Sequence, residues 1–235
     1  MNTRKLLFAA MLMFLSIATA HAQTADEIIN KHIEAIGGKD AWKKVNSLKM
    51  TGSIMAQGTE ISVVSSTLEK KGARQDITLG GMSGYAIVTP KEGWTFMPFG
   101  GQQKPEAMTA EDVKEAQDQL DVQGELLDYK EKGHTVEYLG KEDVEGTECY
   151  KLKVTMKGGL VKTEFIDPSS YYKIREVQKH TANGKESEQT VDYGNFQKLP
   201  EGIVVPMSIG TGNGNFTVKK CEVNPKLNES IFKVG

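Results

Sequence analysis

Arginine is scarce in this chain of 235 residues. Beyond residue 22 the sequence has two, Arg74 and Arg175. Nucleic-acid surfaces favour a concentrated basic field and bidentate arginine contacts. Without Arg4 and Lys5, the 29 lysines and arginines become 27, against 31 aspartates and glutamates, so the net charge is −4. The sequence therefore argues against a nucleic-acid-binding protein.

Cysteine is equally scarce, with Cys149 and Cys221 as the two cysteines. Two are too few for the disulfide framework of a small secreted domain. In an exported protein a bridge between them is permitted, whereas the alternative is two small buried thiols that never meet. The Cys149–Cys221 pair is therefore a candidate disulfide, with both possibilities open.

Long hydrophobic runs are missing except at the N-terminus, where Arg4 and Lys5 precede the apolar stretch 6–17 and small residues follow over 18–22. This three-part pattern predicts a secretory signal cleaved near Ala22. The run is shorter than the ~20 residues that a membrane span requires, which disfavours an uncleaved anchor. We predict a signal peptide over 1–22 and a single domain over 23–235.

One strongly helical segment begins the predicted domain. Thr24 and Glu27 have the spacing of a capping box, and Gly37 suits the residue after the helix end. Between them Ile28, Ile29, Ile33 and Ile36 fall on one helical stripe, together with His32. A helix with such a face has to cover another surface, and we expect part of the space between them to form the functional site.

The rest of the chain is dominated by patterns of β-strands. Leu48, Met50 and Gly52 alternate with polar residues at the period of two that marks a half-buried strand. Asn183-Gly184 and other short connections favour antiparallel hairpins over parallel crossovers. Near the middle, Thr109 with Asp112 predicts a second helix start, and its weakly apolar continuation is typical of a movable cover.

These patterns predict a mainly β (α+β) fold. A sheet of about a dozen twisted strands tends to curl. We therefore expect a curved antiparallel half-barrel, covered on its concave face by the N-terminal helix and the mid-chain helix.

Apolar residues near the predicted helices and loops are candidates for lining a ligand cavity. The densest run, Trp94–Phe99, lies beside a glycine-rich loop, and methionines adapt to irregular ligands. The candidates are Ile29, Ile33, Ile36, Met55, Met82, Trp94, Phe96, Met97, Phe99, Leu126 and Leu127. Ordinary core packing is the alternative for each of them.

Patterns of catalytic groups are missing. His32, His134 and His180 lie in unrelated contexts and lack the spacing of metal ligands. Ser83 follows a glycine-methionine pair, but Tyr85 stands where a nucleophile elbow requires glycine. We predict a protein that is not an enzyme, without catalytic residues, metal or cofactor.

The segment TADEIINKHIEAIGGKDAWKKVNSLKMTGSI resembles the mature N-terminus of Bacteroidetes-type exported proteins in the outer-membrane lipoprotein-sorting group. The segments FIDPSSYYKIREVQ and VDYGNFQKLPEGIVVPMSI are similar to the same group, which belongs to the LolA/LolB-like superfamily of periplasmic lipoprotein carriers. The resemblance implies a periplasmic half-barrel whose hollow binds the acyl chains of lipids or lipoproteins.

The resemblance also implies a residue role and partners. Arg74, in KKGARQDITLGG, matches an early-strand arginine that helps hold the helical lid closed in the carriers, and the alternative is an exposed strand arginine. A monomer is implied, with transient contact to a membrane or to an inner- or outer-membrane envelope protein. The alternative function is envelope-stress sensing, or a protein-interaction module of the same fold without carrier activity. A hydrolase would require a nucleophile and a base that converge in space.

Overall fold

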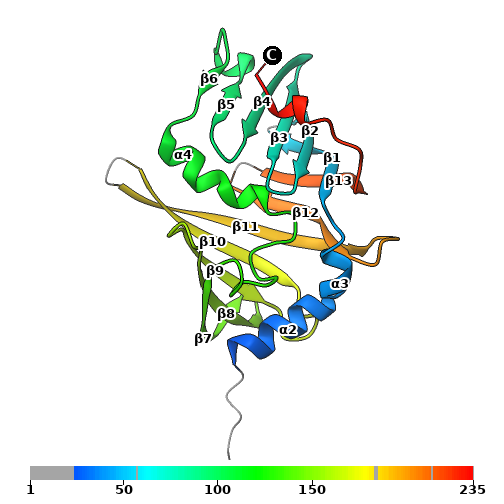
Figure 1. Ribbon diagram of the computed structural model, residues 1–235, viewed down its shortest axis with the longest axis vertical. Coiled ribbons are helices and arrows are strands. Elements are labelled where there is room, and N and C mark those ends of the chain that lie inside the picture. The colour runs from blue at the N-terminus through cyan, green and yellow to red at the C-terminus, as the bar shows by residue number, and fades with distance from the viewer. Residues whose placement is uncertain (1–23, 57, 183–184, 213, 235) are drawn as a thin grey trace, which may run out of the picture.

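The computed structural model describes residues 24–56, 58–182, 185–212 and 214–234, and the predicted signal peptide over 1–22 lies outside them. These residues form one curved antiparallel sheet of thirteen strands that does not close into a barrel (Figure 1). The strands are β1 (Ser47–Ala56), β2 (Thr59–Leu68), β3 (Gly72–Leu79), β4 (Met82–Val88), β5 (Gly93–Phe96), β6 (Glu106–Ala107), β7 (Thr135–Val144), β8 (Thr147–Thr155), β9 (Val161–Ile166), β10 (Lys173–Ala182), β11 (Lys185–Lys198), β12 (Val204–Thr211) and β13 (Gly214–Val223). The predicted fold class is confirmed.

The order of the strands explains how the concave face is covered. Across the sheet the order is β6-β5-β4-β3-β2-β1-β13-β12-β11-β10-β9-β8-β7. Strands β6 and β7 follow each other in the chain but lie at opposite edges, so the connection between them has to cross the sheet. This connection carries α4 (Ala110–Glu115) and the 3-10 helix η2 (Ala116–Leu120). We call residues 116–134 the crossing segment.

Hairpins join most neighbouring strands, as the short connections predict. Strand β10 pairs with β11 as far as Ala182 and Lys185, so the chain reverses at the Asn183-Gly184 position, whose own two residues lie outside the described part. Strand β1 pairs with β13, so the first and last strands of the chain lie side by side in the sheet. Within the described residues, no helix is long and apolar enough to cross a membrane.

Helix α2 (Ala25–Ala35) forms where the sequence predicts it. The Thr24 hydroxyl accepts from the Glu27 amide at 3.2 Å, and the Glu27 carboxylate accepts from the Thr24 amide at 3.0 Å. Gly37 takes a φ of +117°, a conformation that costs glycine little. Ile28 and Ile29 are buried against Leu126 of the crossing segment and residues of β8 and β9. The helix is thereby fixed over one half of the sheet.

The other helices are short. Helix α3 (Lys39–Trp42) buries Trp42 in a second cluster with Val45, Ile203 and Val205. Helix α4 has a capping box between Thr109 and Asp112, as predicted, but buries none of its residues. At the end of η2, Leu120 is buried on β3 and β4 with Ala73 and Val88. The 3-10 helices η1 (Pro98–Gly100) and η3 (Glu229–Phe232) complete the described elements.

Candidate functional site

Two hollows lie between the sheet and the elements that cover it. The first, which we call the apolar chamber, has a volume of about 330 Å³ and lies under α2, α3 and the crossing segment. The second, the polar groove, has a volume of about 1310 Å³. Asp121 and Gln123 line both hollows, so the crossing segment forms a partition between them. A volume of about 330 Å³ falls within the range of small-molecule sites, roughly 300–1,000 Å³.

Apolar side chains from two helices, three strands and the crossing segment form most of the chamber wall. They are Ile33 and Ile36 of α2, Trp42 of α3, Leu48 and Met50 of β1, Val122, Leu126 and Leu127 of the crossing segment, and Phe196, Val205, Pro206 and Ile209 of β11 and β12. The Trp42 indole nitrogen donates to the Ile36 carbonyl at 2.9 Å, and the Val204 amide donates to the same carbonyl at 2.8 Å. These two bonds hold the end of α2 against the sheet and leave the chamber beneath it.

A buried network of charged side chains borders the chamber. Lys162, Glu164, Lys173 and Glu176 come from β9 and β10, whereas Asp118 and Glu125 come from the crossing segment. The Lys162 ammonium lies 2.6 Å from Asp118 and 3.0 Å from Glu176. The Lys173 ammonium lies 2.5 Å from Glu125, 2.9 Å from Glu176 and 3.7 Å from Glu164. Two lysines of the sheet therefore hold the crossing segment by ion pairs.

Strand geometry places these charges on the inner face. Lys162, Glu164 and Ile166 alternate along β9, and Ile166 packs in the cluster under α2. Glu164 stands directly opposite Glu176 on β10, an arrangement of like charges that is unfavourable when both are ionised. The register of this strand pair shifts between Lys173 and Arg175, and such irregularities redirect side chains near sites.

The protonation states of the network follow from burial and neighbouring charge. Burial raises the pKa of the fully buried Glu164 well above its usual value, and the carboxylates of Glu125 and Glu176 add to this rise. Burial opposes ionisation of Glu125 as well, but the Lys173 and Lys162 ammonium groups bring its pKa well below the usual value. The network therefore favours the protonated form of Glu164 and the ionised form of Glu125. In total, four carboxyl groups face two ammonium groups.

Among the described residues, three of these carboxyl groups lie close enough together to be considered as a metal site. Oxygen atoms of Glu125, Glu164 and Glu176 lie within 4.8 Å of one another. The Lys173 ammonium already lies within 3.7 Å of all three groups and supplies the compensating charge. The arrangement therefore fits an ammonium-centred network better than a cation site.

Two further polar residues line the chamber beside the network. The Nδ1 atom of His32 lies 2.7 Å from the Tyr171 carbonyl oxygen, and the residue is 7% exposed. Burial lowers the pKa of His32 to about 4, so the ring is neutral at neutral pH. Tyr193 lies under Lys173, whose ammonium is 5.3 Å from the ring centre. Burial raises the pKa of Tyr193 above its usual value.

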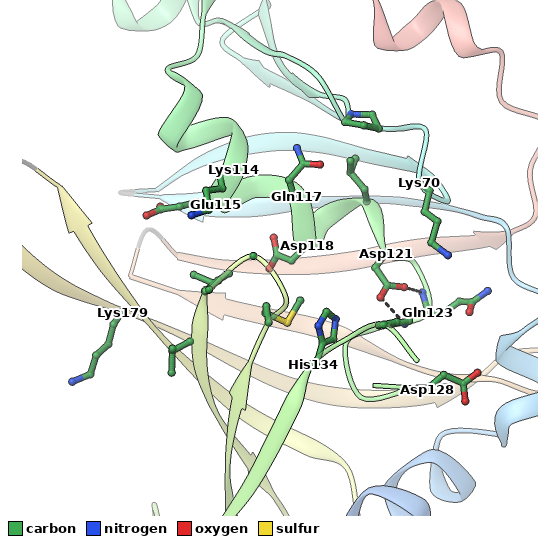
Figure 2. A pocket seen from close by; sticks show the side chains of 18 of the residues that line it. Lys70, Lys114, Glu115, Gln117, Asp118, Asp121, Gln123, Asp128, His134 and Lys179 are labelled. Carbon is green, nitrogen blue, oxygen red and sulfur yellow. Dashed lines mark hydrogen bonds and ion pairs between the residues drawn. The ribbon is translucent and has the colours of Figure 1, made fainter. Parts of the chain in front are cut away.

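The polar groove has a different lining. Figure 2 shows Lys114 and Gln117 from the α4–η2 region on one side, and His134 on another, with Asp118 and Asp121 between them. Five lysines and six acidic residues line it together with apolar residues such as Leu120, Met156 and Leu160, so no single charge sign dominates it. The chamber wall has far fewer charged residues.

The structure brings together part of the predicted lining. Ile33, Ile36, Leu126 and Leu127 line the apolar chamber. Ile29 is 2% exposed and lies in the core beside Leu126. The remaining six candidates lie elsewhere.

Those six lie in the β1–β5 half of the sheet or at its strand ends. Met55 and Met82 are 61% and 49% exposed. Trp94 and Phe96 are on β5, where the Phe96 ring packs 5.8 Å from Tyr85. Met97 and Phe99 pack against Gly84 of β4, where a Cβ atom would contact both side chains. None of the six lines the apolar chamber or the polar groove.

Arg74 contacts the C-terminal segment instead of a helical cover. One of its terminal nitrogens donates to the Ile231 carbonyl at 2.9 Å, and its Nε donates to Asp76 at 2.8 Å. Phe232 of η3 is buried on Gly72, where a Cβ atom would lie 2.4 Å from the ring. Arg74 therefore fastens the C-terminal η3 to the sheet, while lysines on β9 and β10 hold the crossing segment.

The candidate disulfide is absent, and both cysteines are free thiols. Cys149 lies on β8 and Cys221 on β13, five strand positions apart in the sheet. Neighbouring strands are about 4.8 Å apart, whereas a disulfide requires Cα atoms within roughly 7 Å. The strand order therefore separates the two thiols.

Sequence reasoning missed the charged network and part of the chamber wall. Lys162 and Glu164 alternate with Val161, Thr163 and Phe165, so a simple amphipathic interpretation would turn the charges outward. Trp42, Phe196 and Ile209 gave no signal of their own, because they come from segments far apart in the chain.

No family model and no curated protein matches the sequence. Solved structures with a similar fold include the following three. A LolA superfamily protein from Nitrosomonas europaea has a TM-score of 0.55 and 15% identity, covering 89% of this chain and 97% of its own. A domain provisionally assigned as an outer membrane lipoprotein-sorting protein from Vibrio parahaemolyticus has a TM-score of 0.52 and 13% identity, covering 88% and 94%.

The third structure is a DUF1329 family protein from Desulfovibrio piger, with a TM-score of 0.53 and 12% identity, covering 90% of this chain and 98% of its own. At these identities the likeness concerns the fold alone. It confirms at the level of the fold the resemblance that the N-terminal and C-terminal segments indicate. The chain has the fold of the LolA superfamily.

Proposed function

We propose that this protein binds an acyl chain of a lipid or lipoprotein in the apolar chamber and acts by binding rather than by catalysis. The observation that carries the proposal is the chamber itself, a hollow of about 330 Å³ whose wall is mostly apolar. A small hollow in an ordinary core would be filled by side chains, because protein interiors are close-packed. The chamber therefore offers room for a ligand.

The free energy of burial supports this use. Each methylene group that leaves water contributes ~0.8 kcal/mol, so one long acyl chain gains on the order of 10 kcal/mol. The walls that meet such a chain include Met50, whose flexible thioether adapts to different ligands. The fold is shared with a domain assigned to outer-membrane lipoprotein sorting, which agrees with a carrier of acylated clients.

The proposed place of action is the periplasm of a bacterium with an outer membrane. The segment 1–22 has the pattern of a cleaved export signal. Cell fractionation followed by N-terminal sequencing tests this part of the proposal. We expect a periplasmic protein whose first residue follows Ala22, and a cytoplasmic, uncleaved chain would contradict it.

Native mass spectrometry of the protein purified from its own cells, with extraction of bound lipids, tests the proposed function directly. We expect a co-purifying lipid or acylated protein. In a parallel assay, the neutral fluorophore N-phenyl-1-naphthylamine should become brighter on binding. The absence of both a bound lipid and a fluorescence rise would refute the proposal and favour a protein-interaction module.

Matched variants on one strand locate the bound chain. Met50 lines the chamber and Met55 is 61% exposed, although both lie on β1. We expect Met50→Trp to fill the chamber and weaken fluorophore binding about tenfold or more, with no such loss for Met55→Trp. Phe96→Asp should leave binding intact, because Phe96 lines neither hollow. Circular dichroism confirms that each variant is folded.

A further inference from the structure

The ammonium group in the chamber wall has little hydrogen-bond donor capacity to spare. Lys173 is the cation that lines the chamber, and an ammonium group has three donors. Carboxyl groups of Glu125, Glu176 and Glu164 surround it at 2.5, 2.9 and 3.7 Å. Its positive charge is thus committed to the protein and does not attract an anionic ligand.

Hydrogen-bond acceptors, in contrast, remain available. The Tyr171 carbonyl can only accept, so Nδ1 of His32 carries the hydrogen of the neutral ring, and Nε2 is left as an acceptor. Among the described residues, neither Nε2 of His32 nor the Tyr193 hydroxyl has a hydrogen-bond partner, and both side chains line the chamber. His32 is 7% exposed, so water has limited access to it.

The charge of the surrounding network points the same way. Two ammonium groups, of Lys162 and Lys173, face four carboxyl groups, of Asp118, Glu125, Glu164 and Glu176. The network thus holds twice as many acidic groups as basic groups, in a region with little access to solvent. A negative charge brought by a ligand would meet repulsion there, whereas a donor group would find acceptors.

We propose that the chamber selects amphiphiles whose polar group donates hydrogen bonds and carries no negative charge, such as a hydroxyl, an amide or an ammonium group. His32 Nε2 and the Tyr193 hydroxyl accept from this group, and the chain lies among the apolar residues of α2, β1 and β12. The inference rests on the proposed function, since it names the chemical class of the ligand in the same chamber.

A series of ligands with one chain and different polar groups tests the selection. Dodecanol, dodecylamine and dodecanoate each displace N-phenyl-1-naphthylamine from the intact protein near neutral pH, where the amine is protonated and the carboxylate ionised. We expect dodecanoate to bind at least about tenfold more weakly than the other two. Equal or tighter binding of dodecanoate overturns the inference and leaves the proposed function standing. If neither the fluorophore nor any of the three binds, the proposed function fails as well.

A pair of tyrosine variants tests the acceptor role. Tyr193→Phe removes one hydroxyl from the chamber, and Tyr85→Phe removes one from β4, outside both hollows. We expect dodecanol to bind roughly three- to tenfold more weakly to Tyr193→Phe, because one hydrogen bond is lost. Tyr85→Phe should bind dodecanol like the native protein. Unchanged dodecanol binding by Tyr193→Phe contradicts the role assigned to its hydroxyl.

Discussion

His32 shows how one residue of α2 serves both the fold and the candidate site. Its ring is buried against the sheet, its Nδ1 bonds to the Tyr171 carbonyl at 2.7 Å, and its other face lines the chamber. Burial disfavours the imidazolium form of His32, and among the described residues its ring bonds to a carbonyl and to no carboxylate, so the ring stays neutral while α2 is packed. The residue thus couples helix packing to pH.

We expect acid to weaken the fold through His32. Burial lowers the pKa of His32 from 6.5 to about 4, so the unfolded chain binds more protons than the native protein between these values. This contribution to stability is fully present above pH 6.5 and is lost as the pH falls toward 4, with a size on the order of 3 kcal/mol. His32→Asn keeps a donor for the Tyr171 carbonyl but does not titrate. Its melting temperature should therefore fall less than that of the native protein between about pH 7 and about pH 4.

His134→Asn serves as the control for this pH dependence. Burial also lowers the pKa of His134, but its side chain is only partly buried. His134→Asn should therefore reduce the acid-induced decrease in melting temperature by less than His32→Asn does. If His32→Asn retains the full acid-induced decrease, the carboxyl groups of the network are responsible instead. Thermal denaturation followed by circular dichroism over the pH series supplies the measurement.

At the scale of elements, the connection across the concave face consists of two parts with different anchorage. The Leu120 carbonyl accepts from the Lys70 amide at 2.9 Å, and the Val122 amide donates to the Glu69 carboxylate at 2.9 Å. The ion pairs of Asp118 and Glu125 with the sheet lysines add to this. Helix α4, just before them, buries none of its residues. If ligand entry requires movement, we expect α4 to move. The anchored residues between the two hollows should stay in place.

Two identical cap substitutions test this difference. Thr24 caps α2, whose Ile28 and Ile29 are buried, and Thr109 caps α4, which has no buried residue. Thr→Ala at an N-cap costs about 1 kcal/mol of helix stability. We expect Thr24→Ala to lower the unfolding free energy by about this amount, because α2 unfolds only with the core. Thr109→Ala should leave global unfolding unchanged and accelerate amide hydrogen exchange in 110–115. Equal losses of global stability in both variants would show that α4 is part of the same cooperative unit.

At the scale of the whole molecule, the open sheet is held by packing and hydrogen bonds without a covalent link between its halves. Cys149 and Cys221 are free, and burial raises the pKa of each thiol to about 11, which suppresses the reactive thiolate. We therefore expect the same melting temperature with and without a reductant. Thiol titration should find two reactive groups after denaturation and slow reaction in the native protein. A melting temperature that falls with reductant, or fewer than two thiols, would show a bridge that the strand order argues against.

Local patterns predicted most of the architecture because their signals lie within a few neighbouring residues. The Thr24–Glu27 box, the Gly37 helix end and the Thr109–Asp112 box each follow from contacts inside one turn. Period-two alternation and short connections predicted the antiparallel strands, and the twist of a long sheet predicted its curl. These features needed no knowledge of distant contacts.

The candidate site could be predicted only where it belongs to strongly patterned segments. Ile33 and Ile36 follow from the stripe on α2, and Leu126 and Leu127 from their position after the mid-chain helix. Trp42 and Phe196 join them only because α3 and β11 meet over the concave face. The aromatic run 94–99 is equally apolar in sequence, but the strand order places it in the opposite half of the sheet.

By itself, then, the sequence determined the helices, the strand pairing by hairpins and the half-barrel class, since each depends on local propensity or on short spacing. The resemblance of its segments to the LolA group indicated the same fold. The tertiary structure alone decided that the chain between β6 and β7 crosses the sheet and divides its hollow in two. It also decided that Lys162, Glu164, Lys173 and Glu176 face inward, where alternation alone would have turned them to water. Charges can be buried in this way because partners from a distant segment, Asp118 and Glu125, are brought against them, and no local pattern records that meeting.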